Sequence, residues 1–176
     1  AGLPYFVAMQ MLGRGREMIY LNEVRSDTPT SDLPKAASLA DHIFIVILGT
    51  PDRAATMRWY QERLGFDEGG VYTIEYTMIN KAFGLPDGTQ STISMLQHGR
   101  MPIVEVDGYP AAATPRETAP GRLPPGNALV TLAIDSLDRD LPFITAPAKR
   151  EGPLYAGRRA ATVRGPAGEL LDLVEI

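Results

Sequence analysis

Residues 165–176 read GPAGELLDLVEI, and residues 13–24 read GRGREMIYLNEV. The two segments share a glycine, a glutamate four positions later, and a strand-like run of apolar residues around one central position. A third copy of this strand reads IVEV at residues 103–106. The centre is Asp172 in one copy and Glu105 in another, although acidic residues are depleted in strands and costly to bury unpaired. A metal ion or a bound ligand would compensate these carboxylates.

The repetition extends over most of the chain, which is a reason to treat the sequence as a set of related units. Residues 41–108 and 128–176 each read as a strand, a helix and three further strands, which is a βαβββ unit. Residues 1–25 repeat only the closing hairpin of such a unit. A polar linker at residues 26–40 and a Pro- and Gly-rich connector at 109–127 separate these parts.

The expected elements follow from turn residues and from hydrophobic periodicity. Thr50 and Pro51 predict the start of a helix in the first unit, and Gly65 predicts its end. Asp135 predicts the start of a short helix in the second unit, which Pro142 must shorten. Strands are expected at residues 5–11, 17–24, 41–48, 71–78, 91–97, 101–107, 128–134, 153–156, 159–164 and 169–176.

Composition excludes several classes of partner. The chain has 176 residues, of which 44% are hydrophobic and 22% charged, and its net charge is −4. This suits one domain with a real core, and no stripe of Lys and Arg is present to bind nucleic acid. The absence of cysteine excludes disulfides, thiolate ligands and a Cys nucleophile. No apolar run approaches the roughly 20 residues of a membrane span and no targeting segment is visible, so a cytoplasmic location is expected.

Three segments together suggest a family. They read DHIFI at residues 41–45 with WYQERLGF at 59–66, PPGNALV at 124–130, and GPAGELLD at 165–172. In this order they resemble the vicinal-oxygen-chelate superfamily, which includes glyoxalase I, bleomycin-resistance proteins and extradiol dioxygenases. The resemblance covers residues 41–176. It implies an α+β fold in which paired βαβββ modules form a cup-shaped mixed β-sheet.

The resemblance also implies a metal site. In metal-dependent members, one residue from the first and one from the last strand of each module holds a divalent ion. The corresponding positions here are His42, Glu105, Leu129 and Asp172. Three of them can ligate Zn, Ni, Mn or Fe, but Leu129 replaces an expected ligand and Asp172 replaces a more usual Glu. This departure counts against dioxygenase chemistry, which needs two His and one carboxylate on iron.

By the same resemblance, the protein has a small-molecule pocket and performs lyase or isomerase chemistry on an oxygenated substrate. A divalent ion would polarise adjacent oxygens, and Glu105 or Asp172 would act as the catalytic base. Two alternatives stay open. The chain is a metal-free binding protein of the resistance type, with Leu129 as an apolar wall, or it is a non-catalytic lobe of a larger two-domain protein.

Each candidate residue also has a structural interpretation. His42 could bond to the backbone at a strand end, and Glu105 and Asp172 could each form an ion pair with an arginine. The hairpin of residues 1–25 is marginal in water on its own, so it must dock either on the sheet of the same chain or on a second copy of the chain. Because unpaired edge strands tend to pair between chains, a homodimer is expected.

Overall fold

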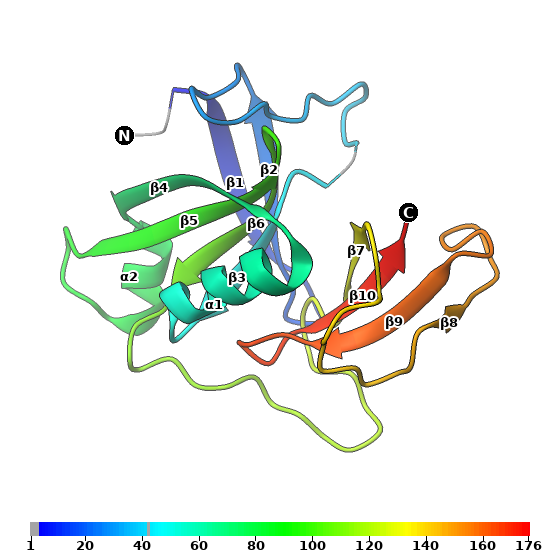
Figure 1. Cartoon of the computed structure of the whole chain (residues 1–176). Coiled ribbons are helices and arrows are strands. Elements are labelled where there is room, and N and C mark those ends of the chain that lie inside the picture. The colour runs from blue at the N-terminus through cyan, green and yellow to red at the C-terminus, as the bar shows by residue number, and fades with distance from the viewer. Residues whose placement is uncertain (1–3, 42) are drawn as a thin grey trace.

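The computed structural model describes residues 4–41 and 43–176. The described residues form a two-stranded hairpin, two four-stranded mixed sheets and three short helical segments (Figure 1). This confirms the predicted α+β fold class. The hairpin consists of β1 (Phe6–Leu12) and β2 (Met18–Val24). The first sheet has the order β3 (Val46–Thr50), β6 (Met101–Gly108), β5 (Gln90–His98), β4 (Asp67–Glu75), and the second has the order β7 (Val130–Ile134), β10 (Leu170–Glu175), β9 (Arg159–Arg164), β8 (Ala148–Lys149).

The helix between β3 and β4 begins two residues later than the sequence indicates. Helix α1 (Arg53–Trp59) starts after Asp52, whose side chain accepts a hydrogen bond from the Ala55 backbone N–H. Thr50 does not cap the helix, because its hydroxyl bonds to that of Thr56 at 2.8 Å. The helix continues as a π-helical turn, η1 (Tyr60–Leu64), and ends as predicted at Gly65, which has a φ of 79°.

One hydrophobic core joins the two sheets, and α1 with η1 lies inside it. Tyr60 is fully buried there, and its hydroxyl donates to Glu169 in the turn before β10 at 2.7 Å. Leu137 and Leu141 also enter this core from an irregular segment, so the expected helix after Asp135 is wrong. Because α1 and η1 of the first unit already cover the second sheet, that sheet needs no helix of its own. The buried members of the core are Met57, Tyr60, Leu64, Phe66, Leu96, Val104, Val106, Leu132, Ile134, Leu137, Leu141, Ala161, Val163, Leu171 and Leu173.

Three strand predictions also need correction. The strand expected at residues 41–48 begins only at Val46, and the strand expected at 71–78 ends at Glu75. Helix α2 (Thr77–Phe83) follows it, and the alternating pattern hid this helix because its first residues continue the alternation. Residues 153–156 form a turn between two glycines of positive φ, Gly152 and Gly157.

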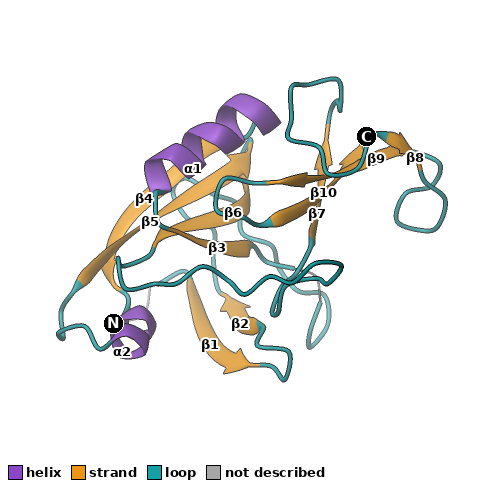
Figure 2. Ribbon diagram, turned by 90° about the horizontal axis from the view of Figure 1, so that it is seen from below, coloured by secondary structure: helices purple, strands orange, loops and turns teal. Residues whose placement is uncertain are grey.

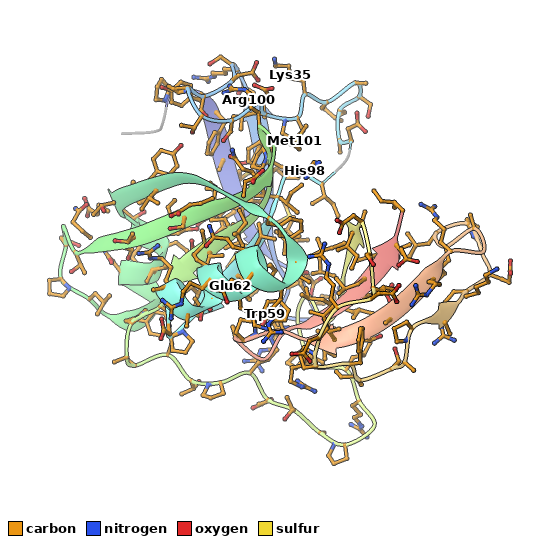
Figure 3. All side chains as sticks on the ribbon, in the orientation of Figure 1. Lys35, Trp59, Glu62, His98, Arg100 and Met101 are labelled. Atoms are coloured by element: carbon orange, nitrogen blue, oxygen red, sulfur yellow. The ribbon has the colours of Figure 1, made fainter. Side chains whose placement is uncertain are left out.

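The hairpin and α2 lie on the side of the first sheet away from α1 (Figure 2). A hydrogen bond of 2.8 Å between the hydroxyls of Tyr20 and Tyr76 joins β2 to the residue before α2. The linker reaches the far end of the sheet, where Asp32 accepts from Arg100 Nε at 2.8 Å and donates its backbone N–H to the Arg100 carbonyl (Figure 3). The hairpin and the linker that follows it are therefore each bonded to the first unit.

None of the helices in the described part of the chain combines the length and apolar character needed to span a bilayer.

Candidate active site

Strand β6 carries two carboxyl groups on the face of the first sheet that lies away from α1. Since side chains alternate along a strand, Val104 and Val106 enter the core beneath α1, and Glu105 and Asp107 point to the opposite face. Glu105 is 8% exposed and Asp107 is 1% exposed. The predicted site residue Glu105 thus has an acidic neighbour two positions along the same strand.

The two carboxyl groups perturb each other. Burial and then the negative charge of Asp107 raise the pKa of Glu105 to about 9. Burial also raises the pKa of Asp107 to about 6, although the Glu105 carboxyl group lowers it in part. Such a pair shares one proton near neutral pH, and Glu105 is its main holder. Neither carboxylate oxygen of Asp107 accepts a hydrogen bond of normal geometry from a described residue, so both offer acceptors to a donor.

Three tyrosines surround the pair. Burial raises the pKa of Tyr20 to about 12, and the charges of Asp107 and Glu105 contribute in the same direction. Burial also raises the pKa values of Tyr76 and Tyr109, again with contributions from both carboxylates. At neutral pH all three phenols are therefore protonated and able to donate hydrogen bonds close to the carboxyl pair.

The ring of Tyr109 packs directly on the backbone of Gly49, in the space that a side chain at position 49 would occupy. Its ring lies on Gly49 so closely that an added Cβ would come within 2.6 Å of the ring, and it also contacts the ring of Phe83 at 6.0 Å between centroids. Gly49→Ala should therefore displace Tyr109 and destabilise the protein by about 1–3 kcal/mol in urea unfolding. Gly108→Ala is the matched control, because its Cβ would meet only ordinary contacts at 3.7 Å or more. Equal stability of the two variants would contradict this packing.

The repeated strand occurs in β2, β6 and β10. The structure brings the copy in β2 close to the copy in β6, but it does not bring together the copies in β6 and β10, which carry Glu105 and Asp172. Tyr20 occupies the central position of the copy in β2, and its electrostatic neighbours include Glu105. Asp172, the centre of the copy in β10, has no described contact with Glu105. It is buried in the second sheet, where Tyr155 Oη donates to its Oδ2 at 3.0 Å and Thr131 Oγ1 donates at 3.4 Å. The hairpin, and not the second sheet, thus faces Glu105.

The remaining predicted ligands do not complete a metal site. His42 lies outside the described residues, and Leu129 is exposed at the start of β7. In the described ranges, no three His, Asp or Glu side chains are grouped so that they could hold a metal ion. Asp172 is engaged by hydroxyl donors of its own sheet, away from Glu105. The described residues therefore do not fit the four-position ligand set that the resemblance implies.

An open depression of about 310 Å³ lies where β5 begins and β6 ends. Tyr109 forms part of its wall, whereas neither Glu105 nor Asp107 does, and burial followed by the charges of Asp107 and Glu105 raises the pKa of this tyrosine. The guanidinium of Arg53 borders the depression from the start of α1 and donates to Ser94. The depression can therefore hold a small molecule against Tyr109.

Sequence reasoning missed Tyr76, Asp107 and Tyr109 as site residues. A signal for Asp107 was present, since a carboxylate two positions after Glu105 in a strand must share its face. No comparable signal identified Tyr109, because its position depends on the fit of its ring against Gly49.

No family model matches the sequence, and a search of curated proteins found no match. Solved structures do match. A glyoxalase family protein from Bacillus cereus aligns with a TM-score of 0.55 and 18% identity, over 81% of this chain and 98% of that one. A point mutant of glyoxalase I from Zea mays aligns with a TM-score of 0.58 and 16% identity, over 97% of this chain and 54% of that one. The chain thus spans about half the length of the maize protein.

These similarities confirm the resemblance at the level of the fold. The chain has a glyoxalase-like fold, and the match to the maize structure covers 97% of it.

Proposed function

We propose that the protein binds a small hydroxylated carbonyl compound on the first sheet and catalyses proton transfer there, as a lyase or isomerase does. The observation that carries this proposal is the buried pair of Asp107 and Glu105, in which Asp107 accepts no hydrogen bond from any other described residue. Buried polar groups are normally satisfied, and each exception needs a physical explanation, of which a catalytic role is one. The nearby tyrosine hydroxyls and the depression at the end of the same strand support the same proposal.

The two carboxyl groups have complementary roles. Asp107, as carboxylate, removes the proton from the carbon next to the substrate carbonyl, and Glu105, as acid, protonates the carbonyl oxygen. The product of this step is an enediol, and reversal of the two transfers at the neighbouring carbon gives the isomer and restores both carboxyl groups. A pair of acids with separated pKa values is suited to such a division of roles.

The local charge indicates the substrate class. Asp107 offers two acceptors and the phenols offer donors, so hydroxyl and carbonyl groups are both accommodated. A negatively charged substrate would be repelled by the carboxylate in a poorly solvated site. We therefore expect neutral hydroxy-ketones or hydroxy-aldehydes rather than phosphorylated or acidic compounds.

Hydrogen–deuterium exchange into hydroxyacetone, followed by NMR in D₂O, tests the proposal. The wild-type protein should accelerate exchange at the carbon next to the carbonyl, and Asp107→Asn should reduce the acceleration by about 100-fold. Asp172→Asn is the matched control, because this carboxylate lies in the other sheet, and its rate should stay within about twofold of wild type. No acceleration by the wild-type protein, or equal loss in both variants, would contradict the proposal.

A divalent metal remains a prediction for this fold, and the proposed proton transfers do not require one. We expect Leu129→His and the wild type to bind Zn²⁺ equally weakly in calorimetry, because Leu129 precedes β7 and Asp172 lies in β10, both in the second unit, and no contact of either with Glu105 is present among the described residues. Tight binding by the variant alone would show that the predicted ligands converge. Elemental analysis of protein purified without chelators provides the companion measurement.

A further inference from the structure

The outward face of the hairpin is an exposed apolar surface. It consists of Met9, Met11, Ile19 and Leu21, which form two cross-strand pairs and are 39–55% exposed. The opposite side of the hairpin carries Tyr20 and faces the first sheet. In Figure 2 the hairpin lies at the margin of the molecule, on the far side of the first sheet from α1. A contiguous apolar face of this kind is typical of an interaction site.

The equivalent face is buried in the second sheet. The repeat aligns Met9, Met11, Ile19 and Leu21 with Ala161, Val163, Leu171 and Leu173. The cross-strand register is the same, since Met11 pairs with Ile19 and Val163 pairs with Leu171. The four equivalents are only 0–3% exposed. The molecule therefore contains one covered and one uncovered version of the same surface.

The covered version shows what kind of element fits. Helix α1 and turn η1 lie in the core with it, through Met57, Tyr60 and Leu64. The Tyr60 hydroxyl donates to Glu169, which also accepts from the Ala167 backbone N–H. A specific hydrogen bond thus accompanies the apolar contact between helix and hairpin.

The uncovered version retains the acceptor for this bond. Glu17 corresponds to Glu169, and its side chain lies over Gly13 just as that of Glu169 lies over Gly165. No described residue donates a hydrogen bond to the Glu17 carboxylate, whereas Glu169 has two donors. In addition, β2 has no parallel neighbour among the described strands, whereas β10 pairs in parallel with β7.

We propose that the outer hairpin face is a docking surface for an amphipathic helix like that of residues 53–64, which carries an apolar stripe and a tyrosine that donates to Glu17. The helix covers Met9, Met11, Ile19 and Leu21. This inference does not depend on the proposed reaction.

The same face of a second copy fits less well. Two hairpins packed face to face would not supply a tyrosine donor to Glu17, because Tyr20 lies on the other face of the hairpin. The α1 helix of a second copy is already committed to its own core, where Tyr60 bonds to Glu169. The maize structure is consistent with a separate unit, because 97% of this chain aligns with only 54% of that protein, which has further chain of its own.

A fusion tests the proposal. An added copy of residues 43–66 is joined by a flexible Gly/Ser linker to the N-terminus of the full chain, which raises its effective concentration to the millimolar range. Hydrogen peroxide then oxidises exposed methionines, and mass spectrometry measures each rate. Met9 and Met11 should be oxidised about tenfold more slowly than in the unfused chain, because docking buries them. Met101, 44% exposed on β6, should be unaffected.

The matched control fusion carries Met57→Asp, Tyr60→Phe and Leu64→Asp in the added copy only, and it should give no protection. Glu17→Gln in the active fusion should reduce the protection. Equal oxidation in the active and control fusions would overturn the proposal. An unfused chain that is dimeric by light scattering, with Met9 and Met11 already protected, would also overturn it and identify a second copy as the occupant. If the fusion does not fold, a peptide of residues 51–66 added to the unmodified chain must give the same protection.

Discussion

Glu105→Gln should stabilise the protein in alkaline solution and leave its stability almost unchanged near pH 4. The pKa of Glu105 is raised by burial and by Asp107, so between about pH 4.5 and pH 9 the folded chain binds more protons than the unfolded chain. The free energy of unfolding therefore falls as the pH rises through this window. Glutamine cannot ionise, and its amide can donate to Asp107.

We expect the variant to exceed the wild type by on the order of 3 kcal/mol at pH 9, as measured by urea unfolding. Glu62→Gln is the control, since this side chain is exposed on η1 (Figure 3) and its removal should change little at either pH. If wild type and Glu105→Gln showed the same pH dependence, the two carboxyl groups would not be coupled in the folded protein.

Tyr60→Ala should destabilise the protein more than Gly49→Ala does. Tyr60 is 1% exposed in the core shared by both sheets, and truncation of a large buried aromatic residue costs about 3–5 kcal/mol. Tyr60→Phe keeps the ring and removes only the hydroxyl that donates to Glu169, so we expect a loss of about 1–2 kcal/mol.

A double-mutant cycle separates the ring from the hydroxyl in the same urea experiment. In a Glu169→Ala background, Tyr60→Phe should cost much less, because its partner is already missing, while the effect of Tyr60→Ala should remain large. An unchanged cost of Tyr60→Phe in that background would show that the hydrogen bond does not contribute.

Much of the fold could be predicted because it depends on local periodicity and on the repeats. The strand expected at residues 159–164 matches β9, and the hairpin of β5 and β6 is correct within a residue at each end. Gly65 ends its helix as expected, since a positive φ there favours glycine. The prediction of a helix in the second unit was wrong because α1 and η1 of the first unit cover that sheet. No local sequence pattern indicates that a helix from another unit takes this place.

The candidate site was harder to predict because it depends on which repeats face each other. The repeat and the family resemblance favoured a pairing of Glu105 with Asp172, one from each complete unit. The structure instead places Tyr20 opposite Glu105, with the docked linker holding the hairpin in position. The face of Glu105 could be derived from strand alternation, but its partner could not, because a tertiary arrangement decides it.

Helix α1 and turn η1 pack against both sheets, and this arrangement predicts how the protein dissociates after proteolytic cleavage. The connector at residues 109–127 is an irregular surface segment that contributes nothing to the shared core, so proteases should cut it before either sheet. Because Met57, Tyr60 and Leu64 lie in one core with Leu171 and Leu173, the two fragments should stay associated after the cut. A nicked molecule should elute as one species in native gel filtration and separate only in denaturant. What the sequence presents as two successive units therefore behaves as one cooperative body, in which neither half has a complete interior of its own.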